Sequence, residues 1–345
     1  MGGGQGIAAV LEAVEMERTI KTRATKVLGI SHPVVLGGMG TGTSPELVAA
    51  VCNAGGLGVM GVSARPAEDM RKLAGEIRER TGAPFGLNLL LFRSSPELVA
   101  AALAEAPAVV STAWPEARQD LAEVFSRAHD AGSLVMHMVS TVGEAVAAYE
   151  AGADLIVAQG TEGGGHVGTM GTSVLVPMVA RQVPVPVLAA GGFADGAGLV
   201  AALALGAEGI LLGTRFLATD EAPLHAALKR AIVDSDGHDT LITEITDVAA
   251  GVVWPGAYAR VKRNRLVEDW IGREGDLRRH RDEVRERIDR ARREGDVEHA
   301  VVYTGQTAGL IDSVQPASRV VERIVGEAAV IIRSRLASAL GAAAG

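Results

Sequence analysis

The chain has 345 residues, of which 48% are hydrophobic, and a formal net charge of -8 at pH 7. This length allows one large α/β domain with a substantial core, and the acidic balance gives no electrostatic reason to expect a nucleic-acid partner. The single cysteine, Cys52, excludes an intrachain disulfide and a cysteine metal cluster. We find neither a membrane-length apolar run nor a signal-peptide pattern, so we expect a cytoplasmic protein that acts on a small molecule.

Apolar runs recur at regular intervals after an N-terminal extension, residues 1–30, in which residues 8–28 predict a short amphipathic helix at the bottom of the fold. Eight runs predict strands: Pro33–Gly37, Leu57–Met60, Phe85–Leu91, Ala108–Ser111, Leu134–Val139, Ala153–Ala158, Val185–Ala189 and Glu208–Leu212. Alanine-rich segments between them predict helices: Pro45–Ala54, Pro66–Thr81, Pro96–Glu105, Pro115–Ala131, Val142–Ala151, Val174–Gln182 and Ala197–Leu205.

Strands that alternate with helices through short loops predict a parallel sheet. Eight such repeats predict an α/β fold of the (β/α)8 or TIM-barrel type over residues 31–236, with an eighth helix in residues 222–236. The alternative is a doubly wound open sheet. The even spacing of the repeats, and the lack of a GxGxxG motif after the first strand, favour the barrel.

The repeat stops beyond residue 236, and residues 237–312 are expected to form a lid or insert. Within it, residues 240–261 predict a loop or lid, and residues 262–296 are dense in charges of both signs. This charge pattern predicts a solvated surface helix, with contact to an acidic carrier or a nucleotide as the alternative. Residues 313–345 predict a C-terminal helix that packs on the barrel.

Chemically unusual segments follow the ends of the predicted strands, where barrel active sites lie. The most unusual is Gln159–Gly168, which holds five glycines, a carboxylate and a histidine. Glycines let backbone N–H groups approach a ligand, and an imidazole near neutral pH acts as a base or as a cation. His166 is therefore the candidate catalytic residue, although a lone histidine is more often structural. Glu162 is expected to organise the loop as a hydrogen-bond acceptor.

Two further glycine-containing turns follow the seventh and eighth strands: Ala190–Gly196, and Leu211–Phe216 with Gly213 and Thr214. Their N–H groups, a threonine hydroxyl and a helix N-terminus predict a phosphate-binding cup. The alternative is a pair of tight turns in which Asp195 merely caps a helix. The cup indicates a phosphorylated ligand without saying which.

The remaining titratable residues are less informative. His137 lies within a predicted strand, so a ligand contact and a buried core histidine are equally consistent with its position. Cys52 is expected to be a small buried side chain. Six histidines have no partner pattern, so we expect no metal site: His32, His129, His225, His238, His280 and His299.

As a set, these glycine-rich segments resemble the nitronate monooxygenase (2-nitropropane dioxygenase-like) family, whose members are FMN-dependent barrel enzymes. The resemblance covers about residues 28–235 and 301–312. The segments that carry it are Gly37–Met39, Asn53–Gly58, Pro84–Asn88, Ala158–His166, Ala190–Gly196, Gly213–Phe216 and Gly305–Leu310.

The resemblance implies bound FMN, with O2 as co-substrate and His166 as the active-site histidine. The FMN phosphate would lie at Gly192, Gly213 and Thr214. Candidate contacts to the rest of the cofactor are Gly37, Gly38, Met39, Asn88, Gln159, Gly164, Gly165, Gly191, Leu211 and Leu212. His137 and Tyr303 are the candidate substrate contacts.

The same superfamily includes FMN-dependent enoyl-ACP reductases and NAD(P)H:quinone reductases. Gln159–Glu162 looks most like the nitronate branch, whereas Gly305–Leu310 looks as much like the enoyl reductases. Our first hypothesis is the oxidation of alkyl nitronates to carbonyl compounds and nitrite. The alternatives are an NAD(P)H-dependent reductase and a catalytically silent flavin-binding regulatory protein. A homodimer is compatible with all three.

Overall fold

We describe the protein from a computed structural model, in which residues 19–63 and 65–339 are placed. The amphipathic helix expected over residues 8–28 therefore lies partly outside the described residues. Its last part forms α2 (Arg23–Leu28), which Thr22 begins with a capping box and Gly29 ends in a left-handed conformation.

The predicted barrel is confirmed. Eight parallel strands close in the order β1-β2-β3-β4-β5-β6-β8-β9, and the closing pair aligns Val34 of β1 with Ile210 of β9. The strands are β1 (Val34–Leu36), β2 (Leu57–Gly61), β3 (Phe85–Leu90), β4 (Val109–Ala113), β5 (Leu134–Val139), β6 (Leu155–Gln159), β8 (Val187–Ala190) and β9 (Ile210–Leu212).

Helices follow the strands in the predicted order. They are α3 (Pro45–Asn53), α4 (Met70–Arg78), α5 (Pro96–Ala104), α6 (Leu121–Asp130), α7 (Val142–Glu150), α8 (Thr172–Ala180), α9 (Gly196–Ala204), α10 (Thr214–Leu217) and α11 (Ala226–Val233). The main difference is α6, which begins six residues later than the predicted Pro115, because the side chain of Asp120 caps it by accepting from the Glu123 N–H.

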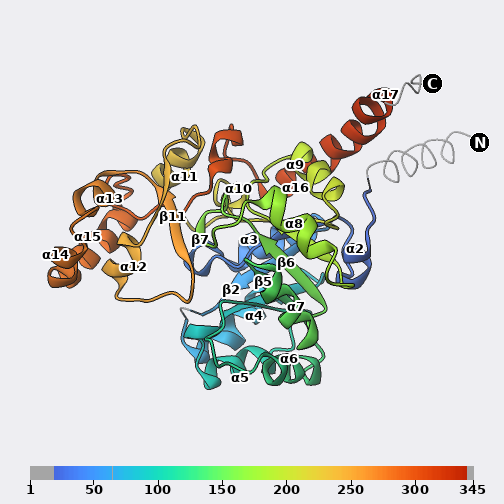
Figure 1. Cartoon of the computed structure of the whole chain (residues 1–345), viewed down its shortest axis with the longest axis horizontal. Helices are drawn as coiled ribbons and strands as arrows, with labels where there is room; N and C mark the ends of the chain where they lie inside the picture. The colour runs from blue at the N-terminus through green and yellow to red at the C-terminus, as the bar shows by residue number, and fades with distance from the viewer. Residues whose placement is uncertain (1–18, 64, 340–345) are drawn as a thin grey trace, which may run out of the picture.

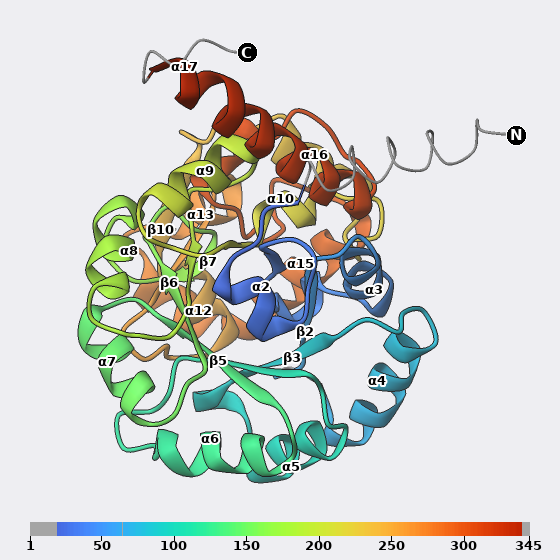
Figure 2. The ribbon, with the colours of Figure 1, turned by 90° about the vertical axis from the view of Figure 1, so that its right-hand side faces the viewer.

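Alternate strand residues fill the barrel interior with apolar side chains, as a packed core rather than a pore. This interior cluster includes Val35, Val59, Val109, Met136, Leu155, Val157 and Leu188. Ala24 and Leu28 of α2 belong to the same cluster, so α2 closes the bottom of the barrel. Figure 2 shows α2 lying across the middle of the ring of helices.

Residues 240–261, predicted to form a loop or lid, are not a loop, because this segment is largely regular. It forms β10 (Thr240–Thr243), α12 (Ile245–Ala250) and β11 (Tyr258–Lys262). A short strand after β6, β7 (Gly165–Val167), pairs with β11 and completes a three-stranded antiparallel sheet in the order β10-β11-β7. The glycine-rich segment Gln159–Gly168 is thus tied by hydrogen bonds to a strand about 90 residues later in the chain.

The charged segment forms three helices rather than one: α13 (Arg265–Trp270), α14 (Glu274–Arg279) and α15 (Arg281–Glu294). The buried residues of α15 are Val284 and Ala291, so most of this helix is solvated, as its charges suggest. We call residues 240–300 the lobe. Figure 1 shows α12 to α15 at one end of the barrel and α2 at the other.

A C-terminal helix is present as α16 (Ala317–Val330), which packs against α9 and α3. It continues through π-helical turns at Ile331–Leu336 into α17 (Ala337–Ala339). The last part of the predicted segment, residues 340–345, lies outside the described residues. Among the helices of residues 19–63 and 65–339, none combines the length and hydrophobicity that a bilayer crossing needs.

Candidate active site at the barrel mouth

The end of the barrel interior opposite α2 brings together four of the residues predicted to contact the cofactor: Gly37, Gly38, Asn88 and Leu211. A Cβ on Gly38 would lie 2.3 Å from Asn88 Cβ, and one on Gly37 would lie 2.8 Å from Leu211 Cδ2, so these glycines let the turn after β1 lie directly on β3 and β9. Asn88 Nδ2 donates to Ser111 Oγ at 3.1 Å, which fixes the amide within the wall.

The turns after β8 and β9 form a cradle of backbone. Gly191 and Gly192 have φ of 82° and 90°, which favours glycine, and a Cβ on Gly191 would lie 2.6 Å from Gly160 O. In the described part of the chain, the N–H groups of Gly192 and Gly213 have no acceptor. Thr214 Oγ1 accepts from the Gly305 N–H at 2.9 Å, which ties this cradle to the segment after the lobe.

Two N–H groups at the N-terminus of α9 are already bonded to carboxylates within the protein. Asp195 Oδ1 accepts from the Gly198 N–H at 2.8 Å, and Glu327 Oε2 accepts from the Gly196 N–H at 3.1 Å. Asp195 is therefore the N-cap of α9, as the alternative interpretation of this turn predicts. The groups left to meet a phosphate are those of Gly192, Gly213 and Thr214.

His166 lies in β7, where it pairs with Ala259 of β11. Its Nε2 is 2.8 Å from Oδ1 of Asp247, and the side chains are only 9% and 11% exposed. The indole of Trp254 stacks on the imidazole with ring centroids 3.3 Å apart and planes within 10°. The mouth thus contains a buried histidine–carboxylate pair that is covered on one ring face.

Tyr303 is the second polar group beside this pair. Its ring centroid is 5.9 Å from that of His166. Partial desolvation of a ring that is still 39% exposed, and next the neighbouring Asp247 carboxylate, raise the pKa of the Tyr303 phenol above its ordinary value. The hydroxyl is therefore protonated near neutral pH and can donate a hydrogen bond.

Aromatic side chains gather at the same place, although the chain has only 5 Phe, 3 Trp and 3 Tyr. Phe92 and Trp114 pack with Trp254 at centroid distances of 4.7 and 6.3 Å. Trp114 adopts a φ of 52°, which is rare for a bulky residue and often marks a functional site. Together with Met138, these rings form an apolar wall beside His166.

The glycine-rich loop is held by two sets of contacts. Glu162 accepts from both the N–H and the hydroxyl of Thr172, which confirms its expected role as the organiser of the loop. A Cβ on Gly164 would lie 2.5 Å from Gly305 N, so these two glycines interlock. Close approach to the Gly305 backbone thus accounts for Gly164 without any ligand.

His137 is placed away from the mouth, and the expectation that it contacts the substrate is not supported. It is 2% exposed and packs against Phe125 of α6, with ring centroids 5.5 Å apart. Its Nδ1 lies 2.7 Å from Thr112 Oγ1. Burial lowers the pKa of His137 to about 4, as expected for a neutral histidine within the barrel wall.

Three residues of the mouth were not identified from the sequence. Asp247 and Trp254 lie 81 and 88 positions beyond His166, and no local motif links them to it. Trp114 follows β4, and no feature of the sequence around it indicated a role at the mouth. The scarcity of aromatic residues is the signal that could have pointed to the two tryptophans.

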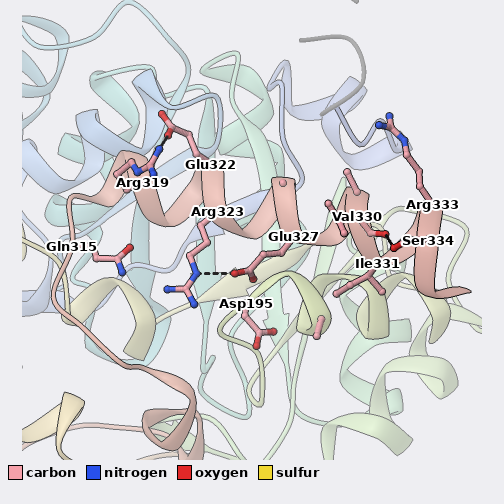
Figure 3. Close-up of a pocket in the computed structure, with 13 residues that line it drawn as sticks. Asp195, Gln315, Arg319, Glu322, Arg323, Glu327, Val330, Ile331, Arg333 and Ser334 are labelled. Carbon is pink, nitrogen blue, oxygen red and sulfur yellow. Dashed lines mark hydrogen bonds and ion pairs between the residues drawn. The ribbon is translucent and has the colours of Figure 1, made fainter. Parts of the chain in front are cut away.

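A surface groove lies elsewhere, between the start of α9 and the outer face of α16 (Figure 3). Its charged side chains are largely paired, with Arg323 Nε 2.7 Å from Glu327 Oε1 and Arg319 Nη1 2.9 Å from Glu322 Oε2. It has none of the chemistry of the barrel mouth. Within residues 19–63 and 65–339, no group of three or more His, Cys, Asp or Glu side chains is arranged to hold a metal ion.

Comparison with known proteins gives consistent matches. The sequence model of the family described as nitronate monooxygenase matches residues 21–106 and 96–327. A probable nitronate monooxygenase of Staphylococcus aureus is 30% identical, over 89% of this chain and 97% of its own. The structure of FabK from Thermotoga maritima superposes with a TM-score of 0.83 at 36% identity, covering 93% of this chain and 100% of that one.

A third relative is named (3aS,4S,5R,7aS)-5-hydroxy-7a-methyl-1-oxo-octahydro-1H-indene-4-carboxyl-CoA dehydrogenase and comes from Rhodococcus jostii. It is 36% identical over 230 residues, which is 66% of this chain. The match spans 64% of that relative's own length, just under two thirds.

Proposed function

The chain belongs to the nitronate monooxygenase family, and on that premise we propose that it is an FMN-dependent enzyme that oxidises alkyl nitronates with O2 to carbonyl compounds and nitrite. The observation that carries the proposal is His166, which Asp247 and Trp254 hold at the barrel mouth beside the protonated Tyr303. The reaction class, oxidation–reduction, is inferred from the family. The position of the substrate is inferred from these side chains.

The residues present fit FMN. The free N–H groups of Gly192 and Gly213 and the Thr214 hydroxyl suit a phosphate, which needs several donors. Farther along the mouth, Gln159 Oε1 is buried and has no hydrogen-bond partner among the described residues, so it can accept from a polar ring edge. Asn88 and the backbone of Gly37–Met39 would line the rest of the ring.

The side chains around His166 suit an anionic substrate. A nitronate is already a carbanion equivalent, so its oxidation needs orientation and hydrogen-bond donors more than a strong base. The Tyr303 hydroxyl, and His166 in its doubly protonated form, can both donate to the nitronate oxygens. Phe92, Trp114 and Trp254 would pack on the alkyl group and exclude water. Bound FMN would supply the redox chemistry between nitronate and O2.

The proposal is tested by steady-state turnover of the flavin-loaded protein with an alkyl nitronate in air. We expect nitrite release and O2 uptake without any nicotinamide. His166→Asn should lower kcat/KM by about 10²-fold or more while flavin content is unchanged. His129→Asn is the matched control, because His129 also pairs with a carboxylate, Asp154, but at an exposed position. Sustained nitronate consumption only in the presence of NADH or NADPH would overturn the proposal.

A second candidate is the NAD(P)H-dependent reduction of an enoyl thioester or a quinone. It is favoured by the Rhodococcus relative, which is named as a carboxyl-CoA dehydrogenase and is 36% identical over 66% of this chain, against 30% over 89% for the probable nitronate monooxygenase. The apolar wall of Phe92, Trp114 and Trp254 would also suit such a substrate. Flavin-dependent NADH oxidation that rises on adding an enoyl-CoA or a quinone would support this candidate.

A further inference from the structure

We propose that Asp247 is a positioning residue: it holds His166 as the tautomer protonated at Nε2, so that Nδ1 is the nitrogen that meets the substrate. This inference rests on the proposed role of His166 as the group that handles the substrate. It identifies Asp247 as the residue that orients the imidazole, and Nδ1 as the imidazole nitrogen that faces the substrate.

The contact itself assigns the nitrogen. Asp247 Oδ1 lies 2.8 Å from His166 Nε2. An ionised carboxylate only accepts hydrogen bonds, so the ring nitrogen that faces it must carry the proton. In a neutral imidazole, the other nitrogen, Nδ1, then has the free lone pair. Nδ1 can take a proton from a substrate or, once protonated, donate a hydrogen bond to it.

Both partners are fixed by rigid elements. His166 is held by the pairing of β7 with β11, which aligns it with Ala259. Asp247 is a buried residue of α12, and Ile245 and Ala249 of that helix pack into a core cluster of the lobe. The carboxylate is therefore presented by a packed helix rather than by a mobile loop. Such support is what keeps a catalytic group in one orientation.

Trp254 removes the remaining freedom of the ring. Its indole lies parallel to the imidazole at a centroid distance of 3.3 Å, so a ring flip would have to displace it. A flip would also place Cε1 where Nε2 now lies and break the bond to Asp247. The orientation that places Nδ1 away from the carboxylate is thus held both by a hydrogen bond and by packing.

Two other histidine–carboxylate pairs show what an ordinary surface pair looks like in this chain. His129 and Asp154 have side chains that are 41% and 31% exposed, and those of His299 and Asp296 are 28% and 43% exposed. Neither histidine has an aromatic ring stacked on it among the described residues. The pair at the mouth is the buried and covered one, and it adjoins Tyr303.

The direct test is the tautomeric state of His166 in the flavin-loaded protein, read from the ¹⁵N chemical shifts of ¹⁵N-histidine-labelled enzyme. The His166 signals are assigned by their loss in His166→Asn. We expect a proton on Nε2 and a bare Nδ1 in the neutral ring. A proton on Nδ1 with a bare Nε2 would overturn the proposal, and this measurement needs no variant that alters Asp247.

Substitution then tests whether Asp247 is the cause. In Asp247→Asn the amide can also donate, so the strict preference for a proton on Nε2 should weaken or reverse, whereas Asp247→Glu should retain it. Asp296→Asn, which changes the exposed pair with His299, should leave the His166 signals unchanged. Unchanged His166 signals in folded Asp247→Asn would contradict the proposal.

Kinetics separate this inference from the proposed function. Asp247→Asn should lower kcat with the substrate that the enzyme turns over by about 10²-fold or more, with a smaller change in KM and unchanged flavin content. Asp247→Glu should restore part of this loss. If His166→Asn leaves turnover intact, His166 does not act in catalysis. Asp247 then cannot contribute to catalysis by positioning it. If His166→Asn abolishes turnover while Asp247→Asn leaves it intact, only the positioning role fails.

Discussion

Two glycines decide how closely the loops of the mouth approach one another. Gly164, next to the strand that holds His166, leaves no room for a side chain, because a Cβ would lie 2.5 Å from Gly305 N and 2.6 Å from the Thr304 carbonyl carbon. The reverse also holds, since a Cβ on Gly305 would lie 2.7 Å from Glu162 O. The position of the segment that carries Tyr303 is therefore determined by backbone contact with the loop that leads to His166.

Gly164→Ala should therefore push these loops apart. We expect a lower melting temperature, together with a raised KM, because backbone atoms rather than flexible side chains would have to move. Gly143→Ala is the matched control. Gly143 lies in α7 with nothing within 4 Å of its added Cβ, so this change should be neutral or stabilise the fold by up to about 1 kcal/mol. Equal effects of the two substitutions would contradict the interlock.

His137 makes the stability of the fold depend on pH. Its pKa is lowered to about 4 in the folded protein and is about 6.5 in an unfolded chain. Between these values the unfolded state binds more protons, so stability falls as the pH drops from 6.5 to 4, by at most about 3 kcal/mol from this group.

Chemical unfolding at several pH values measures this contribution. The variant His137→Gln should lose less stability than the native protein between pH 6.5 and 4. The control is His238→Gln, because His238 is exposed. An acid loss in His137→Gln as large as in the native chain would contradict a neutral buried histidine at this position.

What the sequence could indicate about single residues follows from how local the signal is. His166 was found because glycines surround it within a few positions. Asp247 and Trp254 could not be found, since their contacts with His166 depend on the pairing of β7 with β11 across the fold. His137 stayed ambiguous, because the strand pattern alone does not say whether its ring faces the interior or Phe125 of α6.

Among the secondary-structure elements, α2 has the clearest separate task, which is to close the end of the barrel opposite the site. Leu28 is 3% exposed and belongs to the interior cluster, whereas its neighbour Val27 is 39% exposed. The helix thus contributes to stability without touching the mouth.

Leu28→Ala should therefore cost about 2–5 kcal/mol of unfolding free energy, with KM and flavin content unchanged at temperatures where the variant is folded. Val27→Ala, one residue away on the same helix, should change the unfolding free energy by about 0.5 kcal/mol or less. Denaturant titration measures both. A Leu28→Ala variant as stable as Val27→Ala would mean that α2 does not seal the barrel.

The barrel strands could be predicted because each is a continuous apolar run bounded by turn residues, and parallel strands repeat that pattern. The sheet of β10, β11 and β7 could not. Its short strands do not form long apolar runs, and the pairing of β7 with β11 joins segments far apart in the sequence. The charges of residues 262–296 gave the solvated character of α15 correctly but not the break into three helices.

For the molecule as a whole, the site is shared between the barrel and the lobe. The barrel supplies the cradle at Gly192 and Gly213, and β7 supplies His166. The lobe supplies Asp247 and Trp254, which bind and cover that histidine. Tyr303 comes from the segment that leads back from the lobe. The groups that contact His166 therefore come from outside the barrel strands.

The most direct test is the visible spectrum of the purified, flavin-loaded protein in the absence of oxygen. We expect an alkyl nitronate to bleach the flavin absorbance, and we expect NADH and NADPH at the same concentration to leave it unchanged over the same time. Readmission of air should restore the absorbance and release nitrite. Bleaching by a nicotinamide but not by the nitronate would contradict the proposed oxidation and assign the protein to the reductases.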